Sequence, residues 1–238
     1  DRLLVPMIFQ PYADDLARRL VEFAPARVLE LAAGTGVVTR ELAARLPAAT
    51  SIVATDLNPA MLEEAAQRPI ARPVAWQQAD ACDPHFDDAS FDAVVCQFGV
   101  MFFPDRVQAF REARRMLAPG GLLLFNSWDA IADNEFADVV TQALAERFPG
   151  ASLQFLARTP HGYHDPARIR LDLAAAGFTQ SQVETLTERS RASSARVPAI
   201  AYCQGTPLRN EIEALGEDAL DEATEAAASA LTQRFGAG

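Results

Sequence analysis

Apolar and polar positions in the first half of the chain follow two periods that alternate and predict helices and strands in turn. Apolar residues recur every three to four positions, as in amphipathic helices, over 11–23, 37–46, 59–67 and 105–117. Short runs that are apolar at nearly every position, typical of buried parallel strands, lie at 27–31, 51–55, 74–78, 91–96 and 122–127. This order predicts an α/β fold with a doubly wound, mostly parallel, Rossmann-like sheet and flanking helices.

The pattern becomes rich in helices beyond Trp128. Helices are expected at 134–148 and 166–176, a strand at 179–186, and two or three helices up to residue 235. We therefore expect two parts of one globular unit: a Rossmann-like core over 1–128, and lid helices, a sheet-edge strand and C-terminal helices over 129–238. No flexible linker separates them.

The stretch from Val28 to Gly36, followed by Asp56, is the strongest functional signal. An apolar strand enters a small-residue turn and a helix, and a carboxylate follows about 20 residues later, the spacing at which an acid meets a nucleotide ribose. Ala32 and Val37 stand where a dinucleotide fold has its first and third glycines, and Glu30 places negative charge where a pyrophosphate would sit. This disfavours a nicotinamide-dependent oxidoreductase and favours a cationic cofactor without phosphates.

Five segments in this order resemble the class I S-adenosylmethionine-dependent methyltransferases, in the small-molecule branch that includes the ubiquinone/menaquinone-biosynthesis C-methyltransferases. The segments are 30–36 (ELAAGTG), 54–62 (ATDLNPAML), 78–81 (QADA), 91–98 (FDAVVCQF) and 115–121 (RMLAPGG). The resemblance covers about residues 16–128 and implies S-adenosylmethionine as cofactor. It also implies methyl transfer to a small, apolar or aromatic metabolite. One departure is Ala32, where the family more often has glycine.

The resemblance also implies a role for each matching residue. Asp56 would accept hydrogen bonds from both ribose hydroxyls, and Asp80 would receive the adenine amino group. The full set of implied cofactor-binding residues is Glu30, Ala32, Ala33, Gly34 and Gly36 at the first turn, Asp56, Leu57 and Met61 at the second, Asp80, Ala81 and Cys82, and Gln97 and Phe98 beside the methionine moiety.

Several of these residues also have a purely structural interpretation. Glu30 could cap the turn at the end of its strand, and Asp56 could be an ordinary loop acid. Asp80 lies in a loop with abundant acids, so it could be a surface turn residue. Cys96 is interpreted as a small buried residue rather than a nucleophile.

No catalytic residue is assigned by the sequence. Alignment of the acceptor with the methyl group can supply much of the rate, but a phenol, enol or ring-carbon acceptor is helped by a base near neutral pKa. His161, Tyr163 and His164 cluster in one loop and are the candidates. In the alternative interpretation this loop is only a turn, in which Asp165 caps the next helix.

The composition limits the kinds of molecule that the protein is expected to bind and its expected location. Against 21 basic residues the chain has 32 acids and a formal charge of −11, which disfavours nucleic acid and leaves a small-molecule methyl acceptor. The three cysteines are far apart and match neither a disulfide framework nor a metal site, so a reducing cytoplasm is expected. No apolar run reaches the length of a membrane span. A homodimer is left open.

Two further expectations concern the sheet edge and the alternative function. Sheets of this family close with a reversed pair of strands, and the seventh would fall after about residue 235, so the final edge strand is expected to be missing. The alternative to an enzyme is a cofactor-binding protein without turnover, a silent or regulatory homologue.

Overall fold

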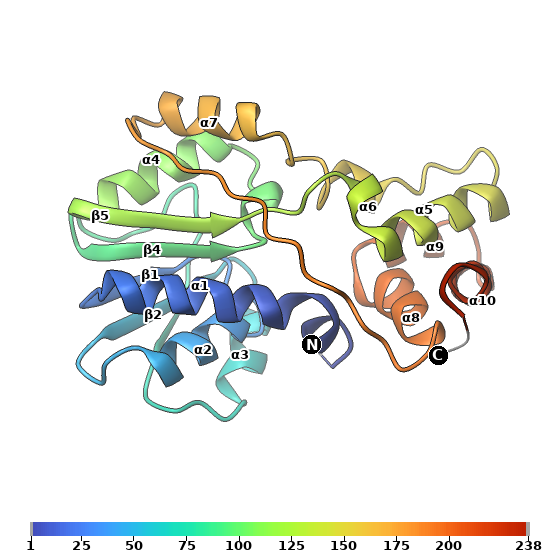
Figure 1. Ribbon diagram of the computed structural model, residues 1–238, viewed down its shortest axis with the longest axis horizontal. Coiled ribbons are helices and arrows are strands. Elements are labelled where there is room, and N and C mark those ends of the chain that lie inside the picture. The colour runs from blue at the N-terminus through green and yellow to red at the C-terminus, as the bar shows by residue number, and fades with distance from the viewer. Residues whose placement is uncertain (1, 237–238) are drawn as a thin grey trace. The chain divides into compact units, whose positions relative to one another are not determined.

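A five-stranded parallel sheet forms the larger part of the computed structural model, which describes residues 2–236 (Figure 1). The strands pair in the order β3-β2-β1-β4-β5. All four pairings are parallel, so the carboxyl ends of the strands lie at one edge, where open α/β sheets bind ligands. The strands are β1 (Arg27–Glu30), β2 (Ser51–Asp56), β3 (Ala75–Gln78), β4 (Phe91–Gln97) and β5 (Leu117–Asn126).

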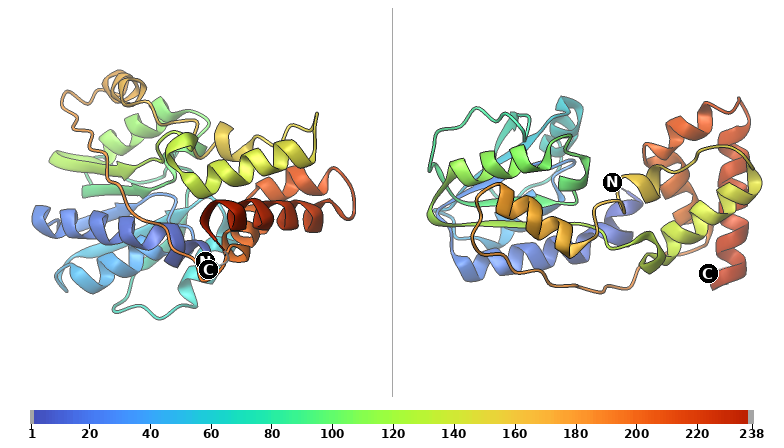
Figure 2. Two further views of the ribbon diagram at one scale, coloured as in Figure 1. Left: turned by 45° about the vertical axis from the view of Figure 1, so that its right-hand side comes forward. Right: turned by 90° about the horizontal axis from the view of Figure 1, so that it is seen from above.

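Helices cover both faces of this sheet. On one side α1 packs against α2 and reaches β4; α4 packs on β5, and α7 on α4. Figure 2 shows α1 and α4 on opposite sides of the sheet. The doubly wound fold expected from the sequence is thus confirmed. The helices are α1 (Gln10–Phe23), α2 (Val37–Arg45), α3 (Pro59–Ala66), α4 (Arg106–Met116) and α7 (Pro166–Ala175).

The central strands are buried on both faces, which explains their unbroken apolar runs. Val28 and Leu29 of β1 and Val94 and Val95 of β4 have no exposed surface. Polar residues mark where two of the helices begin: the side chains of Asn58 and Asp105 accept hydrogen bonds from the first-turn amides of α3 and α4. Local sequence signals and burial therefore select the same elements.

Strand β5 begins five residues earlier than the predicted range 122–127. Leu117 pairs with Phe91 and Leu122 pairs with Ala93, so the residues between Leu117 and Leu122 bulge out of the register. Pro119, which has no amide hydrogen to donate, lies within this bulge. The Pro-Gly-Gly sequence therefore interrupts the strand rather than preceding it.

The strand predicted over 179–186 is wrong. This segment is irregular, and no described residue adds a sixth or seventh strand, so the edge is incomplete as expected. Most of its side chains are exposed and only Val183 is half-buried, so it has no apolar face to bury in a sheet. Glu184 connects this segment to α1, because its carboxylate lies 2.9 Å from the guanidinium of Arg19.

The described chain divides into two compact units. The sheet unit comprises Phe9–Ser127 and Pro166–Leu186, and the helical unit comprises the described residues of Asp1–Ile8, Trp128–Asp165 and Thr187–Gly238. A buried apolar cluster that includes Leu144, Leu208 and Leu231 forms the core of the helical unit. Its helices are the π-helical turn Val5–Phe9, which ends in the sheet unit, and α5 (Glu135–Arg147), α6 (Phe155–Arg158), α8 (Arg196–Gly205), α9 (Leu208–Glu213) and α10 (Ala219–Phe235).

This division differs from the expected parts 1–128 and 129–238 in two segments. Met7 belongs to the apolar cluster of the helical unit, although it precedes the sheet. Conversely, α7 belongs to the sheet unit because it packs on α4. Within residues 2–236, no helix has the length and apolarity needed to cross a membrane.

Candidate cofactor site

The turn that follows β1 is fixed by backbone hydrogen bonds to both neighbouring strands. The amide of Leu31 donates to the carbonyl of Val95 in β4, and the amide of Ala33 donates to the carbonyl of Thr55 in β2, both at 2.8 Å. The chain then passes through Gly36 into α2. The small-residue turn predicted to approach a cofactor therefore lies at the carboxyl edge of the sheet, held on both sides.

This turn needs left-handed backbone and close packing. Gly36 has a φ of 76°, and a Cβ built there would lie 2.9 Å from the Trp76 ring, so both conformation and space require glycine. Ala32 also adopts a left-handed φ, 52°, at a cost of about 1–2 kcal/mol. Its Cβ fills the space beside Gly99, where an added Cβ would lie 2.6 Å away.

Glu30 is buried beneath the turn. It is 1% exposed, and its Oε2 accepts a hydrogen bond of 2.6 Å from the hydroxyl of Thr39 on α2. Burial raises the pKa of Glu30 to about 8, against the opposing effects of the Thr39 hydrogen bond and the positive charge of Arg40. A ligand cation close to Glu30 would favour the ionised form.

Asp56 ends β2 with its carboxylate fixed by two backbone amides. Oδ2 accepts from Gly34 and Oδ1 from Asn58, each at 2.8 Å. Each carboxylate oxygen can accept a second hydrogen bond, so a half-buried acceptor remains at the sheet edge. This arrangement suits a vicinal diol.

The residues expected around an adenine ring differ in exposure. Leu57 is 63% and Met61 41% exposed, so both present apolar surface next to Asp56. Asp80 is exposed, and its Oδ1 accepts from the amide of Cys82 at 2.8 Å. Ala81 is buried.

Gln97 and Phe98 lie where β4 ends. The Gln97 amide donates to the carbonyl of Phe9 at 3.3 Å, while its buried Oε1 has no partner within the described part of the chain. The amide of Phe98 donates to the side-chain oxygen of Asn126 at 2.9 Å, and its ring packs edge-on against Tyr12 at 5.2 Å. Asn126 therefore holds this turn.

The catalytic candidates His161, Tyr163 and His164 all belong to the helical unit. His161 and Tyr163 are buried, and the His161 ring centroid lies 6.1 Å from that of Trp128. Nδ1 of His161 lies 2.8 Å from the carbonyl of Asp129, and Nδ1 of His164 lies 2.7 Å from the carbonyl of His161. Burial lowers the pKa of His161.

The sheet edge fits a positively charged nucleoside better than a dinucleotide. A buried acid lies under the turn, where a ligand cation would favour its ionised form and an anionic phosphate would oppose it. The fixed carboxylate that follows at β2 suits ribose hydroxyls. The uncovered apolar side chains of Leu57 and Met61 offer a surface for a base. Residues 2–236 contain no group of three His, Cys, Asp or Glu residues that could hold a metal ion.

Comparison with known proteins agrees with this assignment. A family model described as a methyltransferase domain matches residues 29–125. The chain is 31% identical over 173 residues to a demethylmenaquinone methyltransferase of Deinococcus radiodurans, covering 68% of this chain and 71% of that protein. It is 34% identical over 178 residues to a demethylmenaquinone methyltransferase of Thermus thermophilus, covering 70% and 79%. The chain belongs to the S-adenosylmethionine-dependent methyltransferases.

A solved methyltransferase structure shares this fold. The crystal structure of an S-adenosylmethionine-dependent methyltransferase from Thermotoga maritima is 20% identical, with a TM-score of 0.55 over 75% of this chain and 76% of that one. This methyltransferase thus uses S-adenosylmethionine and acts on a small molecule. Nothing in the comparisons supports a silent homologue.

Some residues that shape this candidate cofactor site give no signal in the sequence. Thr39 is an ordinary helix residue until α2 brings it to Glu30, and Tyr12 is one aromatic residue in an amphipathic helix. Gly99 follows β4, and its close approach to Ala32 and Cys96, each 2.6 Å from an added Cβ, shows why it is glycine.

Proposed function

We propose that this methyltransferase acts on an apolar aromatic acceptor of the demethylmenaquinone type, in its reduced, hydroquinone form. The observation that carries the proposal is the extent of the similarity to two demethylmenaquinone methyltransferases. Each alignment runs for more than 170 residues and so extends well beyond the matched domain at 29–125. A ring carbon beside a phenolate is a good carbon nucleophile and needs no metal ion.

The cofactor residues are proposed from the geometry of the sheet unit. Asp56 would hold the ribose hydroxyls, Leu57 and Met61 would contact the adenine ring, and Asp80 would accept its amino group. Glu30 and Oε1 of Gln97, which has no partner among residues 2–236, would supply acceptors for the ammonium group. Bound there, S-adenosylmethionine supplies an electrophilic methyl carbon. The remaining proposed contacts are Ala32, Ala33, Gly34, Gly36, Ala81, Cys82 and Phe98.

His161 is the candidate for taking the proton that a hydroquinone gives up in exchange for the methyl group. The Asp129 carbonyl can only accept, so Nδ1 of His161 carries the hydrogen and Nε2 holds the lone pair. The lowered pKa keeps this ring neutral at pH 7, as a base requires. Nδ1 of His164 also contacts a carbonyl, that of His161, and therefore also carries the hydrogen. Tyr163 and His164 remain the other candidates.

The cofactor and the acceptor can be tested separately. Calorimetric titration of the purified protein with S-adenosylmethionine, and with NAD as control, tests the cofactor. Binding of the former alone, lost in Asp56→Ala, is the expected result; binding of NAD instead would refute the site. Transfer of a labelled methyl group is then measured with reduced 2-unsubstituted naphthoquinones bearing prenyl tails, with small amines as controls.

Product analysis separates ring-carbon from oxygen methylation. Methylation of the amines but not of the naphthohydroquinones would overturn the proposed acceptor while leaving the cofactor site intact. His161→Gln should slow transfer and remove the fall in kcat/KM at low pH that a neutral base produces. The same effect in His164→Gln, and not in His161→Gln, would assign the base to His164 instead. A homodimer and a cytoplasmic location remain predictions.

A further inference from the structure

The loop between β3 and β4 carries three of the proposed cofactor contacts, Asp80, Ala81 and Cys82, without any regular structure of its own. Within it, the Asp80 carboxylate accepts from the amide of Cys82, and the Asp80 carbonyl accepts from the amide of Asp83 at 3.1 Å. Nδ1 of His85 contacts the carbonyl of Asp83 at 2.9 Å. These contacts shape a local turn, but they do not attach it to the sheet or the helices.

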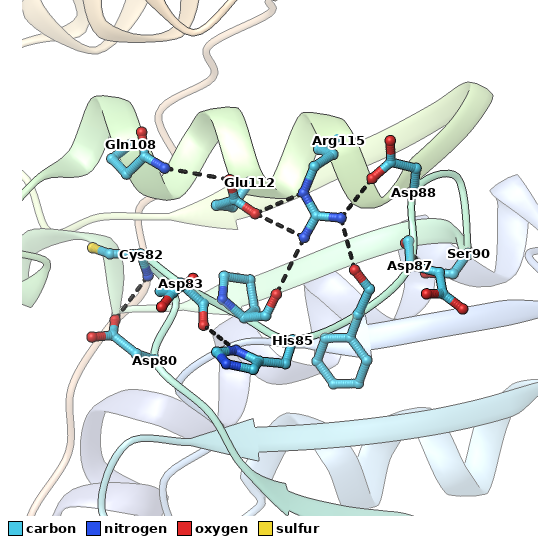
Figure 3. Close-up of polar contacts among 12 residues, drawn as sticks. Asp80, Cys82, Asp83, His85, Asp87, Asp88, Ser90, Gln108, Glu112 and Arg115 are labelled. Atoms are coloured by element: carbon cyan, nitrogen blue, oxygen red, sulfur yellow. Dashed lines mark hydrogen bonds and ion pairs between the residues drawn. The ribbon is translucent and has the colours of Figure 1, made fainter.

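A single side chain on α4 attaches the second half of this loop (Figure 3). The guanidinium of Arg115 donates to the carbonyl of Phe86 at 2.7 Å and to the carbonyl of Pro84 at 3.2 Å. It also pairs with the carboxylate of Asp88 at 2.7 Å. The carbonyl of Arg115 in turn accepts from the amide of Ala89 at 3.0 Å.

The orientation of Arg115 is itself fixed from the preceding turn of α4. Glu112 accepts from Nε of Arg115 at 2.8 Å, and Gln108 donates to Glu112 at 3.3 Å (Figure 3). The hydrogen bonds that Arg115 donates to Asp88 and Glu112 raise the pKa of Arg115. Since a guanidinium presents five donors in a rigid plane, it can serve two carbonyls and two carboxylates together, whereas a lysine cannot.

The first half of the loop meets the opposite end of the same helix. Sγ of Cys82 lies 3.5 Å from the carbonyl of Asp105, the residue that caps α4. The loop therefore lies along α4, with Cys82 at the start of the helix and Pro84 to Asp88 at Arg115. The Phe86 ring also packs on Phe91 at 5.3 Å.

We propose that Arg115 is a positioning residue for cofactor recognition: it holds the 80–90 loop on α4 so that Asp80 meets the amino group of adenine. This inference rests on the proposed role of Asp80. Arg115 touches no cofactor atom itself. Its loss frees two carbonyls and Asp88, so the orientation of Asp80 is less well defined, and the discrimination between bases falls.

The test compares two ligands that differ only in the base. S-adenosylhomocysteine carries an amino group where S-inosylhomocysteine carries a carbonyl oxygen, so Asp80 favours the first. In Arg115→Gln, affinity for S-adenosylhomocysteine should fall by about tenfold with little change for the inosine analogue, a loss typical of misplaced contacts. The measured quantity is the ratio of the two dissociation constants.

The matched control is Arg27→Gln. Arg27 pairs with Asp92 at 3.1 Å in the same unit, where β1 begins, away from the carboxyl edge of the sheet. The substitution Arg27→Gln should therefore leave the ratio of the two dissociation constants unchanged. Hydrogen exchange of the 80–90 peptide should accelerate in Arg115→Gln and not in Arg27→Gln.

The possible outcomes distinguish the positioning role of Arg115 from the cofactor site itself. An unchanged affinity ratio in Arg115→Gln overturns the positioning role alone. Failure of the unmodified protein to bind S-adenosylhomocysteine overturns the cofactor site, and this inference with it. If circular dichroism shows that Arg115→Gln does not fold, Arg115→Lys takes its place; it keeps the ion pair with Asp88 but cannot reach both carbonyls, and should give an intermediate ratio.

Discussion

Replacing Glu30 by glutamine should make the protein less sensitive to high pH. The carboxyl group has a pKa of about 8 in the folded protein, against an ordinary value of 4.5 for an unfolded chain. Below pH 4.5 the group is protonated in both states and has no effect on their balance. Between pH 4.5 and 8 unfolding releases its proton, so stability falls as pH rises.

The size of this effect follows from the difference between the two pKa values. Each unit corresponds to about 1.4 kcal/mol, so the full difference amounts to about 5 kcal/mol of stability lost by pH 9. Burial of Glu30 raises its pKa. The Thr39 hydroxyl and Arg40 oppose this rise, and the negative charge of Asp56 adds to it. Glutamine keeps an acceptor for Thr39 and cannot ionise.

Urea unfolding of the ligand-free protein at pH 5, 7 and 9 measures this difference. The decline in unfolding free energy from pH 5 to pH 9 should be smaller in Glu30→Gln than in the unmodified protein by about 4 kcal/mol, because a small part of the full difference is already lost at pH 5. Glu22→Gln, which removes an exposed acid of α1, is the control and should change nothing in this comparison. Equal declines of the unfolding free energy in Glu30→Gln and in the unmodified protein would refute the conclusion that Glu30 is buried and neutral.

The same group should link cofactor binding to proton release. If the ammonium group of S-adenosylmethionine lies near Glu30, binding should ionise the carboxyl and release about one proton at pH 7. Titration calorimetry in two buffers of different ionisation enthalpy measures that number. Zero protons released, with normal affinity, would mean that the ammonium group is bound elsewhere.

Three other substitutions test separate parts of the structure. Asp56→Ala removes the acceptor for Gly34 and should cost about 1–3 kcal/mol in unfolding free energy, in addition to lost cofactor binding; unchanged stability would contradict the hydrogen bond. Gly99→Ala should cost about 1–3 kcal/mol through its clashes with Ala32 and Cys96, and Ala32→Gly, which removes the first clash, should recover part of this loss in the double variant. Leu231→Ala in the helical unit should cost about 2–5 kcal/mol by urea unfolding, and a loss below 1 kcal/mol would contradict its complete burial.

The strands and helices of the first 126 residues could be predicted because their periodicity is strong and their ends carry local signals. Pro59 begins α3 after the capping Asn58, as expected. The segment 179–186 was wrongly predicted as a strand, because a short stretch of sequence does not show whether a neighbouring strand exists to pair with it. The early start of β5 depends on pairing with β4, which the sequence alone does not show.

The residues of the candidate site also fall into those that the sequence could place and those that it could not. Residues inside motifs, such as Asp56 at the end of β2, could be placed because parallel strands bring their carboxyl ends to one edge. Arg115 lies in a motif too, but its partners Pro84 and Asp88 come from an irregular loop about 30 residues earlier. Such contacts follow from tertiary packing, and no period or spacing reports them.

The cofactor edge is assembled from features that each lower the stability of the ligand-free protein. Ala32 and Phe98 hold left-handed backbone without being glycine, Glu30 is a buried acid, and Oε1 of Gln97 is buried without a partner in residues 2–236. All four lie at or just past the ends of β1 and β4, above strands whose apolar side chains are completely buried. A cationic ligand that pairs with Glu30 and Gln97 would remove two of these costs, so part of its binding energy is the relief of a penalty already present in the fold. For that reason the pH dependence of stability and the affinity for the cofactor should change together when Glu30 is replaced.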